Sequence, residues 1–447
     1  MAVREVASGR ALTWGDLDRE ASSSAALLRR AGVRPRDRVA VSLPRCAAYL
    51  TWLLGIWRAD AVAVPLDAGA HPAENAAFLR HAECSAVVGD ADYEDVGLLA
   101  ADAVRRPVAR RGEPSPEHDA LLLYTSGSTG VPRAVRHTHA SIGASARALR
   151  ARYHLGQGTR VMNTLPLSGS HGLFVQTLSL LAHGGTVLLA PLLGPFEAHG
   201  FWDRAAAAGA TFMSTVPAVL KLLLRMAEGG PPPGMRLFTA SAPLDESLRE
   251  EARARWGVRV INCFGMSEAA GWFLYGGLKE PPGCVGKPTR CRVRFLDDGE
   301  MLVRGAQVTP GYWRGESFEW LPTGDLARTD VDGRVILVGR KKRVIQRAGR
   351  SVYPEDIERA LAALPHVREA AVVGVLHDVY GEVPRAFVVP AGETSEGALL
   401  GELRQVLSTA MLPQWIDLVP DLPRLRGGKT DLVRLAALGP RRAISNS

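Results

Sequence analysis

The chain has 447 residues, of which 47% are hydrophobic and 22% are charged. This length exceeds one ordinary domain and the composition is that of a globular protein, so we expect two or more domains with large cores. The formal net charge of +8 comes from 54 Lys and Arg against 46 Asp and Glu, spread along the chain. One basic run, 340–350, is interrupted by Val344 and Ile345 and has no aromatic stacking platform, which argues against a nucleic-acid partner.

Cysteine usage and hydropathy bear on the compartment. The five cysteines, at positions 46, 84, 263, 284 and 291, form no CxxC pair and no zinc-like spacing. An odd number without a framework fits a reducing compartment. The first ten residues lack the apolar core of a signal peptide, and no apolar stretch of about 18 residues follows. We therefore expect a cytoplasmic protein without a membrane span.

Strand and helix patterns alternate at the start of the chain. Thr13 and Asp16 have the spacing of a capping box before a helix that Gly32 ends. Strands are then expected at 38–43 and 61–65, and helices at 46–58 and 73–83. This alternation predicts a parallel sheet. Residues 91–118 lose the periodicity and are interpreted as a solvated crossing segment.

The alternation resumes after residue 138. Helices are expected at 139–152 and 172–182, and strands at 160–165, 186–190 and 259–261. Short β-like runs extend from Gly283 to Gly339, and a βαβ-like tail follows with strands at 344–347, 370–375 and 386–389 and helices at 354 onward and 395–408. We predict an α/β protein with a large N-terminal domain, 1–339, of parallel-rich sheets with helices plus a β-subdomain. A small mobile α+β domain, 340–447, is expected to follow.

A hydroxyl-rich loop follows the strand-like run Leu121–Tyr124. Its residues are Thr125, Ser126, Gly127, Ser128, Thr129 and Gly130. Glycines let the backbone approach a large anion, and the hydroxyls lie beside exposed amides, so the loop suits a polyphosphate. It is not a Walker A loop, because GxxxxGK[ST] is absent. A flexible linker is the alternative, but linkers seldom follow a buried strand.

This stretch, LLLYTSGSTGVPRAVRHT, resembles the phosphate loop of the adenylate-forming superfamily, which includes acyl- and aryl-CoA ligases, peptide-synthetase adenylation domains and luciferases. Family loops usually read YTSGSTGxPKGV, and here Arg133 and Ala134 replace the Lys-Gly pair. Arginine keeps the charge and adds a fork of donors. The resemblance therefore implies that Arg133 still attracts phosphate, with an altered local geometry.

Two further segments resemble nucleotide-binding motifs of the superfamily. NCFGMSE, directly after the strand expected at 259–261, resembles N-x-Y-G-x-T-E, and TASAPL (239–244) resembles SGGAPL. The resemblance implies ATP or AMP contacts from Ser241, Ala242, Pro243, Asn262, Phe264, Gly265, Met266 and Ser267. It also implies that Glu268 holds Mg²⁺, since a hard cation bridging phosphate oxygens needs a carboxylate. A glutamate favoured by a helix dipole is the alternative.

The C-terminal third carries three more matches. Thr323–Gly324–Asp325 resembles the family TGD, which implies that Asp325 accepts both ribose hydroxyls, and Arg340 matches an arginine that also contacts the ribose. Lys342 falls at the family hinge between two domain orientations. Ala348 and Gly349 lie where relatives pass the pantetheine arm of a thiol acceptor.

PRLRGGK, ending at Lys429, resembles the terminal P-x-x-x-x-G-K motif. A carboxylate must attack an already anionic α-phosphate, and a lysine that contacts both partners offsets the repulsion and the developing charge. A lone lysine near a C-terminus is usually solvated. Only six lysines occur in the chain, however, and two glycines precede this one, which favours the catalytic role.

The acid pocket departs from the family pattern. LPLSGSHGL (165–173) resembles LPLFHxHGL, but Ser168 and Gly169 replace the aromatic residue and the first histidine, which opens room and puts the usual gating in doubt. Pocket walls are expected from Gly169, Ser170, His171, Ser214, Thr215, Ala240, Gly265, Met266 and Trp272. A structural role for His171 stays open. No obvious Asp is present for an α-amino group, which argues against an amino-acid substrate.

These motifs predict an ATP- and Mg²⁺-dependent ligase that adenylates a small aryl or short acyl carboxylic acid, releases pyrophosphate and transfers the acyl group to a thiol. CoA is the first choice of acceptor and a carrier protein the second. One alternative is attack by a nitrogen nucleophile, including nitrite activation for diazotisation of an aryl amine. Another is a non-catalytic nucleotide-binding protein, against which intact Lys429, Glu268 and Asp325 argue.

Overall fold

The computed structural model describes residues 1–70, 72–89, 97–99, 114–125, 133–281, 283–347, 350–377, 381–407, 411–425 and 428–438. The chain forms two compact units: unit 1 contains residues 1–293 and 303–321, and unit 2 contains residues 294–302 and 322–447. The chain therefore passes from unit 1 to unit 2 and back before it stays in unit 2. The predicted division into domains 1–339 and 340–447 stays a prediction, as does the mobility of the smaller one.

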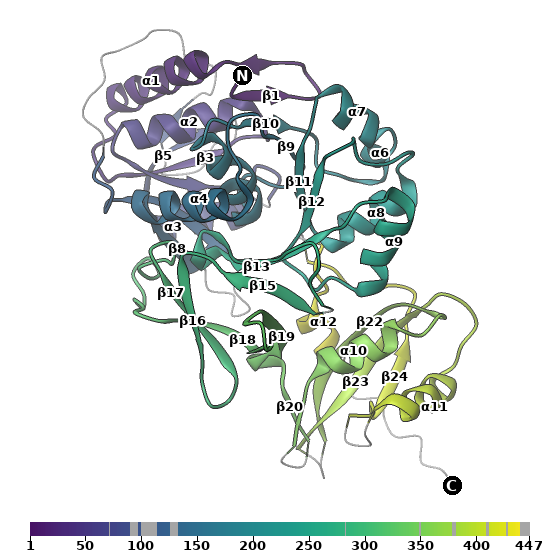
Figure 1. Ribbon diagram of the computed structural model, residues 1–447. Helices are drawn as coiled ribbons and strands as arrows, with labels where there is room; N and C mark the ends of the chain where they lie inside the picture. The colour runs from purple at the N-terminus through teal and green to yellow at the C-terminus, as the bar shows by residue number, and fades with distance from the viewer. Residues whose placement is uncertain are drawn as a thin grey trace. The chain divides into compact units, whose positions relative to one another are not determined.

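The first sheet of unit 1 is mostly parallel (Figure 1). Its strands are β3 (Arg38–Ser42), β4 (Val62–Pro65), β5 (Cys84–Gly89), β6 (Gly97–Leu99), β7 (Asp119–Thr125) and β8 (Arg133–Thr138). The spatial order is β6-β5-β3-β4-β7-β8, and only the β7–β8 pair is antiparallel. The alternation predicted a parallel sheet here, and this prediction is confirmed. The segment interpreted as a crossing segment, 91–118, lies mostly outside the described residues.

The second sheet of unit 1 is parallel in its centre. Its strands are β1 (Val3–Glu5), β2 (Ala11–Leu12), β9 (Arg160–Asn163), β10 (Thr186–Leu189), β11 (Phe212–Thr215), β12 (Arg236–Thr239), β13 (Ile261–Met266), β14 (Gly271–Tyr275) and β15 (Cys284–Pro288). Within unit 1 the order is β15-β14-β13-β12-β11-β9-β10-β1-β2. Strands β13, β12, β11, β9, β10 and β1 run parallel, so their carboxyl ends meet at one edge.

Helices cover both faces of these sheets. They are α1 (Trp14–Arg30), α2 (Ala47–Arg58), α3 (Pro72–Ala82), α4 (His139–Tyr153), η1 (His171–Leu178), α5 (Ser179–Leu181), α6 (Pro195–Ala198), α7 (Phe201–Ala207), α8 (Pro217–Met226), α9 (Glu246–Trp256) and η2 (Ser267–Ala269). Val39 of β3 is buried with α1, α2 and α4, whereas the next residue, Ala40, is buried with Leu79 of α3. In β11, Phe212 joins the first of these cores and Met213 joins the core of α7, α8 and α9. Period-two alternation therefore gives each sheet two buried faces.

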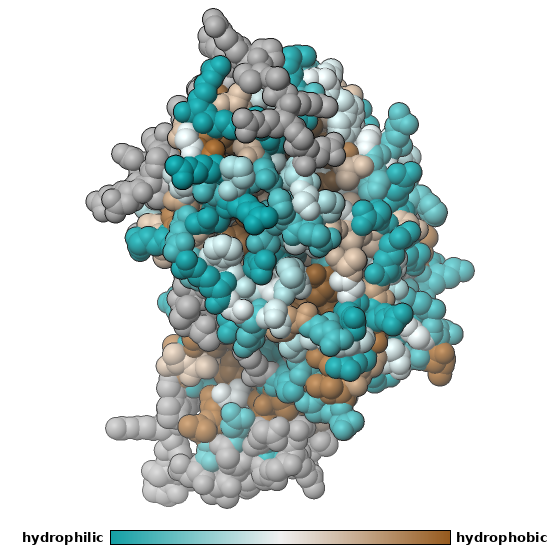
Figure 2. All heavy atoms as spheres, turned by 90° about the vertical axis from the view of Figure 1, so that its left-hand side faces the viewer, coloured by the Kyte–Doolittle hydropathy of each residue, from teal (hydrophilic) through white to brown (hydrophobic). Residues whose placement is uncertain are grey.

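Helix α1 begins at the predicted capping box. Thr13 Oγ1 accepts a hydrogen bond from the Asp16 amide at 3.1 Å, and Asp16 Oδ2 accepts one from the Thr13 amide at 2.9 Å, which confirms the prediction. The helix buries Leu17 and Leu28 and exposes Arg19. The side of unit 1 that carries α1 and α3 is accordingly mainly hydrophilic (Figure 2). No helix among the described residues is long and apolar enough to cross a membrane.

Two predicted elements differ from the structure. The helix expected at 172–182 begins as the π-helix η1, because the Gly172 carbonyl accepts side-chain bonds from Asn163 Nδ2 at 3.1 Å and Thr177 Oγ1 at 2.8 Å instead of serving only the helix. The boundaries predicted for the strand at 259–261 are wrong, because β13 starts at Ile261 and extends to Met266. It continues because it gains β14 as an antiparallel partner after its parallel pairing with β12 ends.

Unit 2 consists of a small sheet with helices and a separate hairpin. Its elements are β18 (Leu321–Thr329), β19 (Val335–Arg340), η3 (Lys341–Arg343), β20 (Ile345–Arg347), β21 (Arg350–Val352), α10 (Pro354–Ala362), β22 (Val367–His377), β23 (Gly381–Pro390), α11 (Glu396–Val406), β24 (Trp415–Leu418) and α12 (Leu432–Ala436). Strands β16 (Cys291–Phe295), β17 (Glu300–Gly305) and β18 contribute residues to both units. The predicted βαβ character is present in β23–α11–β24, whereas β22 and β23 are antiparallel.

The small sheet is covered on both faces. Ile357 of α10 and Leu399 of α11 are buried against Val372 and Val388, while Leu435 of α12 is buried against Phe387 on the opposite face. The α/β class with a large N-terminal part and a small C-terminal α+β part is confirmed.

We expect Gly265→Ala to lower the free energy of unfolding by about 3 kcal/mol, because a Cβ would lie 2.1 Å from the Gly271 carbonyl oxygen and 2.6 Å from Trp272 Cα, and backbone cannot move aside cheaply. Urea unfolding followed by tryptophan fluorescence measures it. Gly15→Ala, whose nearest neighbour would be Thr13 Oγ1 at 3.8 Å, is the control and should keep or raise stability. Equal stability of the two variants would contradict the close approach of β13 and β14.

Candidate functional site

His171 lies at the centre of a buried polar cluster at the carboxyl edge of the second sheet. Its Nε2 is 2.7 Å from Ser214 Oγ at the end of β11, and its Nδ1 is 3.1 Å from Ser241 Oγ after β12. The Trp272 ring from β14 lies 5.4 Å from the imidazole, edge to face. Burial lowers the pKa of His171 to about 3, so the ring is neutral. One nitrogen then donates to a serine and the other accepts from one.

The cluster brings together residues that the sequence predicted as pocket walls. His171 contacts both Ser214 and Trp272, and Ala240 is buried beside Ser241. A Cβ at Gly169 would meet only the Pro166 carbonyl at 3.7 Å, so the backbone does not demand glycine there. The absence of a side chain at position 169 therefore leaves space. That these residues bind an acid stays a prediction.

Ser241 has a left-handed backbone with φ +73°, which a non-glycine residue adopts at a cost. Its side chain bonds His171, so the strained turn and the imidazole fix each other. The segment Ser241–Pro243 follows β12 after one residue, and its contact with ATP or AMP stays a prediction.

The NCFGM segment is part of β13. Asn262 Nδ2 donates to the Cys284 carbonyl at 3.2 Å, and the partly exposed Phe264 ring meets Phe273 edge to face at 5.4 Å. The register shifts between Phe264 and Gly265, a bulge of the kind that redirects side chains at sites. Met266 then leads into η2.

Glu268 belongs to a chain of polar contacts that the sequence did not reveal. Tyr312 donates its hydroxyl to Glu268 Oε1 at 2.9 Å, and the Arg133 guanidinium lies over the Tyr312 ring at 5.6 Å. Burial, aided by the Glu268 charge, raises the pKa of Tyr312, so the phenol keeps its proton and holds the carboxylate. Arg133, predicted to attract phosphate, and Glu268, predicted to hold Mg²⁺, are thus linked through Tyr312, which lies 44 positions away from Glu268.

Ser267 is held from two sides. Its hydroxyl donates to Ser170 Oγ at 3.2 Å, which joins the motif to the predicted pocket. Its carbonyl lies 2.8 Å from His137 Nε2, so this nitrogen carries the proton. Burial lowers the pKa of His137 to about 4. Sequence reasoning missed His137, because a lone histidine inside a strand carries no motif.

Several predicted residues lie outside the described part of the chain. These are Ser126, Gly127, Ser128, Thr129, Gly130, Ala348 and Gly349. Thr125 is the last residue of β7, where its backbone pairs with Arg133, and Lys342 lies in η3. The predicted strand before the loop is confirmed, since Leu121, Leu122 and Leu123 are buried in β7. The phosphate-loop, thiol-channel and hinge roles stay predictions.

In unit 2, Asp325 and Arg340 face each other across the β18–β19 hairpin. They are register partners, and Arg340 Nε lies 2.6 Å from Asp325 Oδ1. Burial raises the pKa of Asp325 to about 6, while Arg340 opposes this rise. The other oxygen, Oδ2, is buried without a hydrogen-bond partner among the described residues. A buried carboxylate oxygen of this kind can accept a hydrogen bond from a ligand.

Lys429 lies near the same pair. Its turn is closed by hydrogen bonds from the Leu425 amide to the Lys429 carbonyl at 2.8 Å and from the Gly428 amide to the Leu425 carbonyl at 2.9 Å. The residue is open to solvent, but surrounding protein atoms and Arg340 lower the pKa of its amine while Asp325 opposes them. Unit 2 therefore collects three residues predicted for the nucleotide site: Asp325, Arg340 and Lys429.

Lys341, the residue before the predicted hinge, was not singled out from the sequence. Its Nζ lies 2.6 Å from Asp298 Oδ2 and 2.7 Å from Glu300 Oε2, and these contacts raise its pKa. Glu300 also accepts the Gly324 amide through Oε1 at 3.2 Å. Glu300 thereby connects the turn that carries Asp325 with the segment that carries the predicted hinge.

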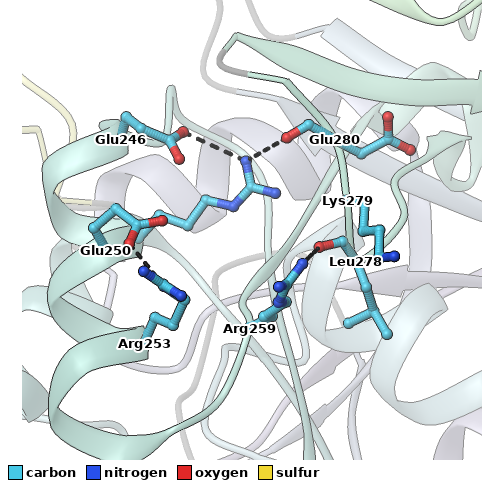
Figure 3. Close-up of a pocket in the computed structure, with 8 residues that line it drawn as sticks. Glu246, Glu250, Arg253, Arg259, Leu278, Lys279 and Glu280 are labelled. Atoms are coloured by element: carbon cyan, nitrogen blue, oxygen red, sulfur yellow. Dashed lines mark hydrogen bonds and ion pairs between the residues drawn. The ribbon is translucent and has the colours of Figure 1, made fainter.

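A hollow also lies beside α9, and several of the charged residues that line it are paired with one another (Figure 3). Arg249 donates to Glu246 and to the Glu280 carbonyl, and Arg253 donates to Glu250. None of the predicted site residues lines it. We therefore assign no function to this hollow.

Comparison with known proteins identifies the family. The AMP-binding enzyme family matches residues 2–313, and the AMP-binding enzyme C-terminal domain matches residues 356–429. The chain belongs to this family and to the adenylate-forming superfamily, so the predicted resemblance is confirmed. It is an adenylate-forming ligase.

Similar proteins cover nearly the whole chain. A sulfoacetate–CoA ligase of Cupriavidus necator is 32% identical over 96% of this chain and 92% of its own, and an oxalate–CoA ligase of Arabidopsis thaliana is 29% identical over 89% and 88%. Among solved structures, ATP-bound MatB from Rhodopseudomonas palustris has a TM-score of 0.89 at 26% identity, covering 98% of this chain and 95% of that one.

We expect acidification to weaken unit 1 through His171. Its folded-state pKa of about 3 lies below the ordinary 6.5, so between these values the unfolded chain binds a proton that the folded chain does not. Stability is complete above pH 6.5 and falls below it, by about 2 kcal/mol at pH 5. The deficit of His171→Asn relative to wild type should therefore shrink by that amount from pH 7 to pH 5.

Urea unfolding followed by tryptophan fluorescence suits this measurement, because every tryptophan except Trp415 lies in unit 1. His154→Asn, at the exposed end of α4, is the control and should follow the wild type at both pH values. A constant deficit for His171→Asn would show that the buried imidazole does not carry the effect.

Proposed function

We propose that this chain condenses ATP with a small organic acid and releases pyrophosphate, then transfers the acyl group to a thiol, with CoA as the first choice of acceptor and a carrier protein as the second. In the first step a carboxylate oxygen bonds to the α-phosphorus and the bond to pyrophosphate breaks. In the second a thiolate attacks the acyl carbon and AMP leaves. The CoA ligases that are similar along nearly their whole length support this reading.

The observation that carries the proposal is that Asp325 Oδ2, beside Arg340 and Lys429, is buried and has no hydrogen-bond partner among the described residues. A carboxylate accepts two donors side by side, which fits the two hydroxyls of a ribose. Arg340 fixes the other oxygen, so the acceptor is oriented before the ligand arrives. The three residues therefore suit a nucleotide better than a structural ion pair.

Lys429 supplies positive charge to the first step. Surrounding protein atoms and Arg340 lower its pKa, and its ammonium can attract a phosphate or an incoming carboxylate. Placed between two anions, it offsets their repulsion and the charge that develops on the α-phosphate. No proton transfer by this lysine is needed.

The Glu268 carboxylate is suited to bind Mg²⁺. No group of three His, Cys, Asp or Glu side chains among the described residues could hold a metal, but Glu268 offers a single oriented carboxylate. Mg²⁺ is commonly held by one or two carboxylates together with substrate phosphates and water. When bound it would neutralise phosphate charge, while Tyr312 keeps the Glu268 carboxylate in place.

We expect Lys429→Ala to reduce acid-dependent pyrophosphate release by about 100-fold or more, because the variant loses a charge that acts in the transition state. Thiol transfer from a supplied acyl-adenylate should persist, since that step does not use the contact. Lys279→Ala, on the hollow beside α9, is the control and should keep both activities. Normal pyrophosphate release by Lys429→Ala would remove this lysine from the mechanism.

We expect nucleoside binding to weaken below pH 6. The pKa of Asp325, raised to about 6 by burial, means that the carboxyl gains a proton below this value and loses acceptor capacity. Adenosine is the suitable probe, because it has the ribose but no phosphate that titrates in this range. Its affinity, measured by calorimetry, should fall by up to about tenfold from pH 6 to pH 5. Asp325→Asn should bind weakly at both pH values, and a pH-dependent affinity in that variant would contradict the assignment.

A further inference from the structure

Two buried N–H groups beside His171 have no acceptor. Gln176 in η1 is fully buried and Trp272 is 3% exposed, and neither Gln176 Nε2 nor Trp272 Nε1 has a hydrogen-bond partner among the described residues. The orientation of the Gln176 amide is set, because its Oε1 accepts the Ser214 amide at 3.2 Å. A flipped amide would oppose two donors. Each group can only donate, so each requires an acceptor.

Gln176 and Trp272 are linked through Ser214 and His171. Gln176 bonds the backbone of Ser214, the Ser214 hydroxyl bonds His171 Nε2, and the His171 ring contacts the Trp272 ring. His171 Nδ1 also bonds Ser241, the first residue of the segment 241–243 that is predicted to contact ATP or AMP. Unpaired buried donors are uncommon, and two in one cluster at the predicted acid pocket point to a ligand that supplies the oxygen.

The surroundings restrict the size of that ligand. Phe238 lies 4.7 Å from Phe212 and 5.7 Å from Trp272, ring centre to ring centre, and all three are buried. Beyond Trp272, a Cβ at Gly271 would already lie 2.8 Å from Val175 Cγ2. Aromatic rings and tight packing therefore surround Trp272. An acid with an aryl ring or a long chain would require this packing to change.

The charge of the cluster is also restricted. The groups that face His171 are Ser214, Ser241 and Trp272, all uncharged, and the ring itself is neutral because burial disfavours its protonation. A second anionic group would be buried here without a cation, which is costly. A neutral oxygen needs only hydrogen-bond donors.

We propose that the acid activated by this chain is a short 2-hydroxy or 2-oxo acid whose second, uncharged oxygen accepts hydrogen bonds from Gln176 Nε2 and Trp272 Nε1. This inference rests on the proposed function, since it assigns the His171 cluster to the acid. The reacting carboxylate faces the nucleotide, and the hydroxyl or keto oxygen faces the two donors. Gln176 and Trp272 are then specificity-determining residues.

The test is acid-dependent ATP–pyrophosphate exchange with isosteric pairs. Glycolate should exceed propionate, and pyruvate should exceed isobutyrate, by about tenfold or more in kcat/KM, because the analogue leaves both donors unpaired. Malonate, sulfoacetate, benzoate and nitrite complete the panel. Equal rates within the pairs, or a preference for malonate, sulfoacetate or benzoate, would overturn this inference and leave the proposed function standing. A preference for nitrite would overturn both, because nitrite is not an organic acid. If none of the acids supported exchange, both this inference and the proposed function would be overturned.

Variants separate specificity from folding. Gln176→Leu and Trp272→Phe should lower the glycolate-to-propionate ratio of kcat/KM towards one. Because both acids are measured in the same variant, a general loss of activity does not change this ratio. Trp202→Phe is the matched control, because Trp202 Nε1 is also buried without a hydrogen-bond partner in the described part of the chain, but Trp202 packs in the core of α7, α8 and α9. The ratio of this control should equal that of the wild type. An unchanged ratio in both pocket variants would overturn the assignment.

Discussion

The parallel pairing of β9, β11, β12 and β13 is the constraint on which the site in unit 1 depends. Register places Thr215 beside Thr239 and Thr239 beside Asn262, so loops from distant parts of the chain start at one edge. Parallel strands that are buried on both faces carry few polar side chains. Polar residues therefore gather where the strands end, and His171 connects two of these ends through Ser214 and Ser241.

The site residues of unit 2 depend on a different form of pairing. Asp325 and Arg340 are cross-strand partners in an antiparallel hairpin, so their proximity follows from register rather than from a flexible contact. The hairpin also buries the carboxylate, which raises its pKa to about 6. A carboxylate that is oriented, partly desolvated and half satisfied is suited to bind a ligand at little further cost in ordering.

Much of the fold and part of the site were predictable from the sequence. Alternating strand and helix periods predicted the parallel sheets, the Thr13–Asp16 spacing predicted the helix start, and contiguous motifs identified Glu268, Asp325 and Lys429. The strand at β13 was misplaced because its second half is stabilised by β14, a tertiary partner that a local pattern does not contain. His137, Gln176 and Tyr312 were missed because each is a single residue that reaches the site only through the fold.

The contacts of Lys341 have a mechanical meaning. Asp298 and Glu300, in the turn and first residue of the β16–β17 hairpin, hold its ammonium, and Glu300 also restrains the amide of Gly324. If the backbone torsion angles at the predicted hinge, Lys342, change, Lys341 would therefore stay in place. The residues from 343 onward would then move. Asp325, whose contact with a ribose is a prediction, follows Gly324, and the hydrogen bond from the Gly324 amide to Glu300 would keep this turn in place.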